Sequence, residues 1–280
     1  MADVEVRDAE GVHVVTLSRP DSLNALTLEL LGELLAAFDR AESTGAPVVI
    51  TGSGRAFSAG ADLAALADPP AGSTLGAAVA RRMQTHFNEV PRRIATLGVP
   101  VVAAVNGVTA GGGIGLALAA DVVLASTSAS FTNVFAQQLG LIPDMGASWA
   151  VPRAIGRSRA QAWALLGDQI DAATAASWGL VHEVVPDDHL EATATDVARR
   201  LGRLPAATLL AVTVISVVAA VFINNARQRE QQQRAEATQR LGQTRRIIDD
   251  LLTDLAVSLR TVPGTQRVER LLLERAAEEY

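Results

Sequence analysis

The stretch Arg55-Ala-Phe-Ser-Ala-Gly-Ala-Asp-Leu63 decides how the first two thirds of the chain fold. An apolar run, Val48-Val-Ile50, precedes it and ends in Thr51-Gly-Ser-Gly54, so the pattern predicts a strand that leads into a turn. The small residues at positions 58–61 let the main chain approach a ligand closely before a helical pattern begins at Asp62. Free N–H groups at such a turn can hold an oxyanion.

A second stretch, Ala103-Ala-Val-Asn-Gly-Val-Thr-Ala-Gly-Gly-Gly-Ile-Gly-Leu116, has the same order of apolar strand, glycine turn and small-residue helix. Either turn alone could simply pack a helix on a strand, because glycine turns are common in α/β folds. The two turns in this order are a more specific signal. Together they could supply two N–H donors to one oxygen.

The segments FSAGADL and AAVNGVTAGGG resemble those of the enoyl-CoA hydratase/isomerase family, also called the crotonase family. The resemblance covers about residues 1–203. It implies an α/β fold, a crotonase-like stacked ββα superhelix. It also implies that the peptide N–H groups of Ala61 and Gly112 hold the thioester oxygen of an acyl-CoA.

The same resemblance implies a set of residues that contact the substrate. They are Ala25, Ala59, Ala61, Asp62, Leu63, Gly111, Gly112 and Phe135. Asp62 has the alternative role of capping the helix that follows it. No metal site and no separate cofactor are expected, because coenzyme A is part of the substrate.

The order of apolar patterns supports the same fold. Strands are predicted over residues 12–17, 48–51, 100–105 and 122–125, and a helix follows the N-cap candidate Thr27. Such alternation predicts a mainly parallel, stacked α/β core. Residues 81–97 form an amphipathic pattern, which Pro91 is expected to kink or interrupt. The resemblance of residues 170–185 to the family implies a short helix and a strand there.

The acidic residues decide which chemistry the site can perform, since an oxyanion hole also needs a partner that moves protons. Hydratases of the family use two glutamates, whose positions fall here on Gly115 and Phe135. Neither residue can carry a proton, so hydration by the two-glutamate route is not expected. Asp144, within Gly140-Leu-Ile-Pro-Asp-Met-Gly146, remains as the candidate acid/base.

Asp144 lies in an apolar segment, and partial burial there would raise its pKa toward a useful range for a base. Its alternative role is to cap the helix that begins near Gly146. The resemblance to the isomerase branch implies that an acidic residue at this place moves a proton between C2 and C4 of the acyl group. The sequence therefore predicts an enzyme that shifts the double bond of an enoyl-CoA thioester through an enolate.

Three alternatives stay open. An aryl- or acyl-CoA dehalogenase or hydrolase would use Asp144 as a nucleophile. A hydratase would need an acid that the sequence does not reveal. A non-catalytic protein would bind acyl-CoA without turnover.

The composition of the chain limits which kinds of partner and site it can have. The chain has 280 residues, of which 49% are hydrophobic, a net charge of -6 and no Cys, so a thiolate metal site and a Cys nucleophile are excluded. The negative charge argues against nucleic acid as a partner. His13, His86, His182 and His189 show no metal-ligand spacing. The N-terminus lacks a signal-peptide pattern, so residues 1–203 are expected in the cytoplasm.

The C-terminal part departs from the family pattern. Residues 204–226 contain no charged residue and are about as long as a membrane span, so this segment is either a membrane anchor or a buried helix of an oligomer. Residues 227–280 read as a polar helical tail, an all-helical extension. In composition and in Thr261-Val-Pro-Gly-Thr265 and Leu271-Leu-Leu-Glu-Arg275, residues 204–280 resemble the transmembrane and juxtamembrane segments of bacterial receptor-type Ser/Thr kinases. The family resemblance implies a homo-oligomer, a trimer or hexamer.

Overall fold

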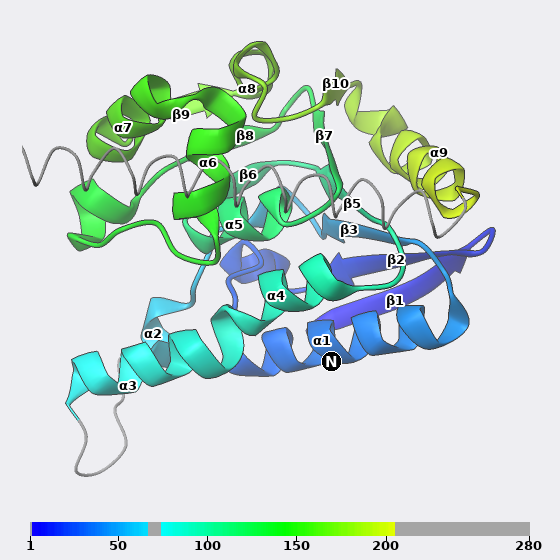
Figure 1. The fold of residues 1–280 in the computed structure, drawn as a ribbon, viewed down its shortest axis with the longest axis horizontal. Coiled ribbons are helices and arrows are strands. Elements are labelled where there is room, and N and C mark those ends of the chain that lie inside the picture. The colour runs from blue at the N-terminus through cyan, green and yellow to red at the C-terminus, as the bar shows by residue number, and fades with distance from the viewer. Residues whose placement is uncertain (1, 67–73, 205–280) are drawn as a thin grey trace, which may run out of the picture. The chain divides into compact units, whose positions relative to one another are not determined.

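The strands form two sheets in the computed structural model, which describes residues 2–66 and 74–204 (Figure 1). The larger sheet has the order β1 (Val4–Ala9), β2 (Val12–Leu17), β3 (Val48–Gly52), β5 (Val101–Val105), β7 (Val122–Ser126), β10 (Glu183–Val185). The smaller sheet has the order β4 (Ala56–Ser58), β6 (Val108–Ala110), β8 (Ser130–Thr132), β9 (Gln169–Asp171). Neighbouring strands are parallel except for the pairs β1–β2 and β8–β9.

The chain passes repeatedly from the larger sheet to the smaller one and then into a helical segment. β3 is followed by β4 and α2 (Leu63–Leu66), and β5 is followed by β6 and α5 (Gly112–Leu118). β7 is followed in the same way by β8 and the π-helical segment η3 (Phe135–Leu139). This stack of ββα units confirms the predicted fold class.

Helix α1 (Leu28–Thr44) shows how the sequence pattern sets a local structure. The Thr27 hydroxyl accepts a hydrogen bond of 3.1 Å from the Leu30 N–H, and Gly45 ends the helix in the left-handed conformation. Its fully buried side chains include Leu31, Leu34 and Phe38. These residues recur at helical spacing, so one face of the helix packs on the core, as predicted.

Six further helices and three short helical segments belong to the described residues. They are α3 (Leu75–Arg82), α4 (Glu89–Thr96), α6 (Ala147–Ile155), α7 (Arg157–Leu166), α8 (Ala172–Trp178) and α9 (Leu190–Gly202), with the short turns η1 (Pro20–Ser22), η2 (Met83–Phe87) and η4 (Asp187–His189). Helix α9 covers one face of the larger sheet through Leu190 and Ala194, which cluster with Val12 and Val49. Helix α1 belongs to the core cluster on the other face.

The predicted interruption of residues 81–97 lies just before Pro91. The helix breaks at the π-helical η2 and Asn88, between α3 and α4, and Pro91 lies within the first turn of α4. Proline is tolerated in a first helical turn because its missing N–H has no intrahelical acceptor there. The break thus lies within the four residues before Pro91, where proline removes a helical hydrogen bond, as the prediction that Pro91 interrupts the pattern requires.

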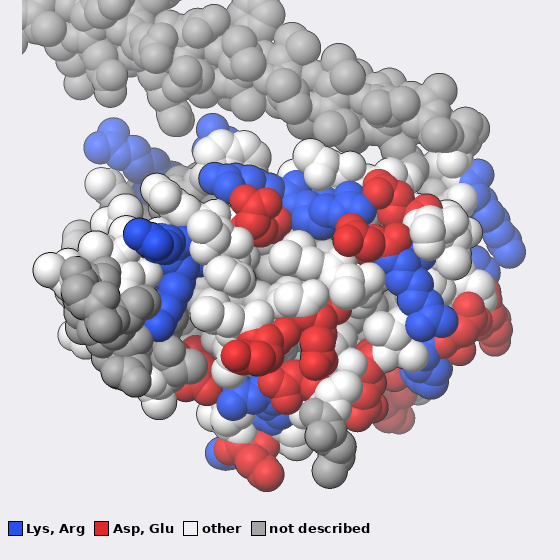
Figure 2. Space-filling view, turned by 90° about the horizontal axis from the view of Figure 1, so that it is seen from below, with Lys and Arg blue, Asp and Glu red and all other residues white. Residues whose placement is uncertain are grey.

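The surface seen from below α1 is a mosaic of acidic, basic and uncharged side chains (Figure 2). Ion pairs join α4 to α1, where Arg93 lies 2.8 Å from Asp39 and 2.6 Å from Glu42. Within residues 2–66 and 74–204, no helix is both long enough and apolar enough to cross a bilayer. The proposed membrane span, residues 204–226, and the tail, residues 227–280, lie outside the described residues except for Leu204.

Candidate active site

In the turn after β4, one peptide N–H group has no hydrogen-bond acceptor among the described residues. The N–H of Ala59 donates to the Leu23 carbonyl at 2.9 Å, and that of Gly60 donates to the Ser58 hydroxyl at 3.2 Å. The Asp62 N–H donates to the Leu26 carbonyl at 3.0 Å. Among the hydrogen bonds of the described residues, none is donated by the Ala61 N–H. Ala61 thus presents a free donor at the end of β4.

Asn24 holds this turn in place. It is fully buried with a positive φ of 54°, and its side-chain amide donates to the carbonyls of Ser53 and Ala56 at 3.0 and 2.7 Å. Its own carbonyl accepts from the Ser58 hydroxyl at 2.8 Å. Sequence analysis did not identify Asn24, although asparagine is among the few residues that tolerate the left-handed region.

The second turn presents another free donor. Gly111 has a φ of 51°, and its N–H donates to the Thr132 carbonyl at 3.3 Å. Gly112 is the first residue of α5, where an N–H has no intrahelical acceptor, and no backbone carbonyl of the described residues accepts from it. The two N–H groups that the family resemblance implies as donors, those of Ala61 and Gly112, therefore have no backbone acceptor among the described residues.

The two turns lie against each other. A Cβ atom on Gly60 would come within 2.8 Å of the Gly112 nitrogen, so only glycine permits this approach. A Cβ atom on Gly111 would lie 3.8 Å from the Ala59 carbonyl oxygen and 3.8 Å from the Phe135 ring. Four predicted site residues, Ala59, Gly111, Gly112 and Phe135, are thus brought together.

Asp144 lies beside the same glycine. A Cβ atom on Gly112 would be 3.3 Å from the Asp144 Oδ1 atom. This oxygen is buried and has no hydrogen-bond partner among the described residues. Helix α6 begins at Ala147 with Gly146 as its N-cap and without a side-chain cap, so Asp144 does not cap it. The alternative structural role for Asp144 was therefore wrong.

The surroundings of Asp144 change its titration. Burial raises the pKa of its carboxyl group from 3.8 to about 6, although its own backbone N–H acts in the opposite direction. Burial has this effect because the ionised form loses water contacts that the one backbone N–H does not fully replace. A carboxyl group with this pKa can accept and return a proton near neutral pH.

The two places where a hydratase of the family would carry glutamate are filled by other groups. A Cβ atom on Gly115 would come within 2.5 Å of the Met145 carbonyl oxygen, so the turn at Met145 occupies this space. Phe135 is buried, and only 4% of its surface is exposed. Asp144 is thus the acid that this structure places at Gly112.

The other predicted contact residues lie around the first turn. Asp62 forms an ion pair of 3.1 Å with Arg19, which also donates to the Ala25 carbonyl at 2.6 Å. Leu63 begins α2 and is 55% exposed. Asp62 directly precedes this helix. Its carboxylate is engaged in the ion pair with Arg19, which is a structural contact.

Metal chemistry has no visible site in the described part of the chain. No group of three or more His, Asp or Glu residues there is arranged to hold an ion. The Nδ1 atom of His13 is buried without a partner, but this residue lies in β2 of the larger sheet. The arrangement at Gly112 is therefore two backbone donors and one desolvated carboxylate.

Comparisons with known proteins show what the chain is similar to. The model of the family described as enoyl-CoA hydratase/isomerase matches residues 7–246. The chain is 42% identical over 200 residues to a 1,2-epoxyphenylacetyl-CoA isomerase of Escherichia coli (strain K12), a match that covers 70% of this chain and 74% of that protein.

Solved structures show the same likeness. A crystal structure of an enoyl-CoA hydratase from Mycobacterium avium subsp. paratuberculosis K-10 superposes with a TM-score of 0.66 and 39% identity, covering 79% of this chain and 87% of that one. A monofunctional enoyl CoA isomerase from M. smegmatis superposes with a TM-score of 0.64 and 31% identity, covering 78% and 94%.

Proposed function

The chain belongs to the enoyl-CoA hydratase/isomerase family, and from this premise we propose that it moves the double bond of an enoyl-CoA thioester. One observation carries the proposal. The single carboxylate that the described residues place beside Gly112, that of Asp144, is half-buried, and its Oδ1 atom is buried without a hydrogen-bond partner there. Such a group is suited to exchange a proton with a bound substrate.

The two backbone donors take the developing charge. We propose that the N–H groups of Ala61 and Gly112 bind the thioester oxygen of the substrate, where negative charge accumulates in the enolate. Fixed donors of this kind stabilise the transition state because they need no reorganisation during the reaction. The contact between Gly60 and Gly112 supports a shared oxygen, since it brings the two turns together.

Asp144 then transfers one proton in two steps. For a 3-enoyl thioester, the ionised carboxylate removes a proton from C2, and the electron pair of the broken C–H bond moves onto the thioester oxygen as a dienolate forms. The protonated carboxyl group returns the proton to C4, and the double bond is left between C2 and C3. The reaction consumes no water and needs no second acid.

The same arrangement is poorly suited to hydration by two glutamates. That route requires one carboxylate to activate water and another to position it, and here the two places hold Gly115 and Phe135. Ala25, Ala59, Asp62, Leu63 and Gly111 stay proposed contacts of the acyl-CoA. Coenzyme A enters only as a part of the substrate.

Product analysis tests the proposal. Purified full-length protein is incubated separately with 3-enoyl-CoA and with 2-enoyl-CoA substrates, and both isomerised and hydrated products are measured. The proposal expects interconversion of the two enoyl-CoA isomers without 3-hydroxyacyl-CoA. Rapid hydration, or a stable ester between the substrate and Asp144, would contradict it and would indicate a hydratase or a nucleophilic mechanism instead.

We further propose that the protein is a cytoplasmic homo-oligomer, and that residues 204–226 contribute to contacts between its subunits and do not anchor it in a membrane. The match to the family model continues through this segment to residue 246, so the segment belongs to the part of the chain that resembles the family in sequence. An apolar segment of this length must be covered by protein or lipid, because exposing it to water is unfavourable. Cell fractionation distinguishes a homo-oligomer from a membrane-anchored protein, since an anchor would keep the protein in the membrane fraction until detergent is added.

A further inference from the structure

We propose that Met145 is a positioning residue that directs the Asp144 carboxylate toward Gly112 and keeps both water and a second acid away from it. This inference rests on the proposed function, because it concerns the group that would move the proton. Sequence analysis named Met145 only as a neighbour of Asp144. Its role follows from its backbone, its side chain and the space that it fills.

The backbone of Met145 has an uncommon conformation. Its φ is 46°, in the left-handed region that residues other than glycine seldom adopt, and Gly146 follows with a φ of 82°. Two successive left-handed residues reverse the chain between Asp144 and α6, and the Asp144 carbonyl accepts from the Ala147 N–H at 2.8 Å. A strained residue persists where its surroundings fix it, and here the turn holds Asp144 against α5.

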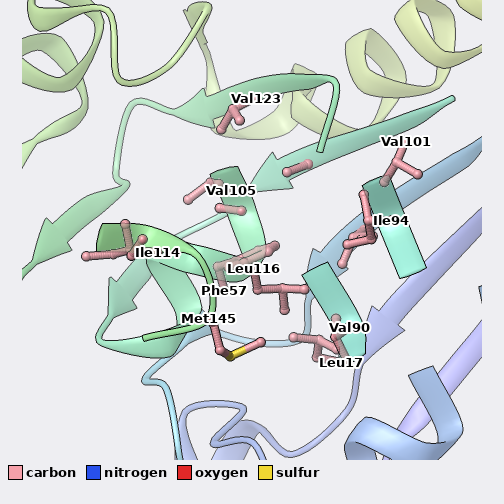
Figure 3. Packing of buried hydrophobic residues seen from close by; sticks show 14 of the residues in the cluster. Leu17, Phe57, Val90, Ile94, Val101, Val105, Ile114, Leu116, Val123 and Met145 are labelled. Carbon is pink, nitrogen blue, oxygen red and sulfur yellow. The ribbon is translucent and has the colours of Figure 1, made fainter. Parts of the chain in front are cut away.

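The side chain of Met145 shares a space with the carboxylate. A Cβ atom on Gly112 would lie 2.9 Å from the Met145 Sδ atom and 3.3 Å from the Asp144 Oδ1 atom. Met145 is only 1% exposed, and Figure 3 shows its side chain extending from the turn toward Val90 within the same core cluster. A thioether donates no hydrogen bond, so it desolvates the carboxylate without satisfying it.

Met145 also closes the neighbouring position. Its carbonyl oxygen and its Cβ would lie 2.5 and 2.7 Å from a Cβ atom on Gly115. Real side chains do not approach this closely, so no residue larger than glycine fits at position 115 while the turn keeps its conformation. The turn thus excludes a second carboxylate from the site and leaves proton transfer to Asp144.

Charged groups on the elements around Asp144 are engaged elsewhere. Helix α5 and segment η3 carry no titratable residue. On α4, Arg92 pairs with Glu89 at 2.7 Å, and Arg93 pairs with Asp39 and Glu42. On α6, Arg153 stacks on Trp149 with 4.0 Å between the guanidinium carbon and the ring centroid. None of these charged groups is paired with the Asp144 carboxylate, whereas the Met145 side chain adjoins the same space beside Gly112.

Two substitutions of similar volume test this inference. Met145→Leu keeps an apolar group beside the carboxylate, whereas Met145→Gln brings an amide that can donate a hydrogen bond to it. The readout is the titration of the Asp144 carboxyl carbon by NMR in the full-length protein, assigned through its loss in Asp144→Asn. Met145→Ala, which admits water, provides the same comparison where Met145→Gln does not fold.

The inference expects Met145→Leu to titrate near the wild-type value of about 6. Met145→Gln or Met145→Ala should titrate closer to 3.8, the ordinary value for aspartate. Equal titration in all of these proteins would overturn the role of Met145. Because the readout is not activity, a shift in Met145→Gln together with a wild type that converts no enoyl-CoA would refute the proposed function alone.

Discussion

The Oδ1 atom of Asp144 lies 3.3 Å from the place where a Cβ atom on Gly112 would stand, so this buried oxygen adjoins one of the two N–H groups that we propose as oxyanion donors. A substrate oxygen held at the Gly112 N–H would carry its reacting carbons past this carboxylate. The absence of a side chain at position 112 is therefore part of the site's chemistry.

Gly112→Ala should impair activity far more than stability. The added methyl group would meet the Met145 Sδ atom at 2.9 Å and the Asp144 Oδ1 atom at 3.3 Å, so both must move. Loss of one aligned oxyanion contact lowers kcat by about 10²-fold or more. Gly32→Ala in α1 is the matched control, since its methyl group meets nothing within 4 Å and should stabilise the helix by about 0.5–1 kcal/mol. Equal kcat values in the two variants would refute this prediction.

The rate of isomerisation should depend on the ionisation of Asp144. The carboxylate must be ionised to remove a proton from C2, and burial raises its pKa to about 6. We expect kcat to rise through this pH and to level off above it, with about a tenfold loss per unit on the acidic side. Asp121→Asn is the control, because Asp121 also has a pKa raised by burial but accepts its hydrogen bond from the Val101 N–H. If the acidic limb of the kcat–pH profile shifts in Asp121→Asn, the assignment of that limb to Asp144 is wrong.

The buried carboxyl group should also leave a signature in stability. Its folded pKa of about 6 lies above its ordinary value of 3.8, so the folded protein binds more protons than the unfolded chain between these pH values. Asp144 therefore costs stability as the pH rises through this window, by about 3 kcal/mol at most above it. Asp144→Asn should be the more stable protein above pH 6 when unfolding free energies are compared with wild type in denaturant. A difference between the two proteins that stays constant from pH 4 to 7 would contradict the burial of this group.

Gly115→Glu should not create a hydratase. Its Cβ would come within 2.5 Å of the Met145 carbonyl oxygen, and overpacking of this kind costs about 1–3 kcal/mol or more. We expect a lower melting temperature and no hydration of 2-enoyl-CoA. Gly76→Glu serves as the control for the change in charge, because that position in α3 has nothing within 4 Å. If Gly115→Glu hydrates 2-enoyl-CoA at an unchanged melting temperature, the turn at Met145 can move to admit a glutamate, and the prediction is wrong.

Much of the fold could be predicted because its signals are local. Thr27 caps α1, and the leucines of that helix recur at helical spacing, so the pattern alone defines the start and the buried face of the helix. The two glycine turns also follow directly from the sequence. In both cases, neighbouring residues carry all the information that the prediction needs.

Other features of the site depend on contacts that no local pattern reveals. The left-handed conformations of Asn24 and Met145 are fixed by tertiary packing, and neither residue type requires a positive φ. The approach of Gly60 to Gly112 joins segments about fifty positions apart. The break before Pro91 could be predicted, but its π-helical form at η2 could not, because the sequence shows only the proline.

The activity of Asp144→Asn with a 3-enoyl-CoA substrate tests the central claim most directly. The variant keeps the shape of the side chain and leaves the N–H groups of Ala61 and Gly112 in place, so binding of the acyl-CoA should persist. We predict that kcat for the formation of 2-enoyl-CoA falls by at least about 10²–10⁴-fold, the usual contribution of a general acid/base. Isomerisation at the wild-type rate in Asp144→Asn would contradict the account.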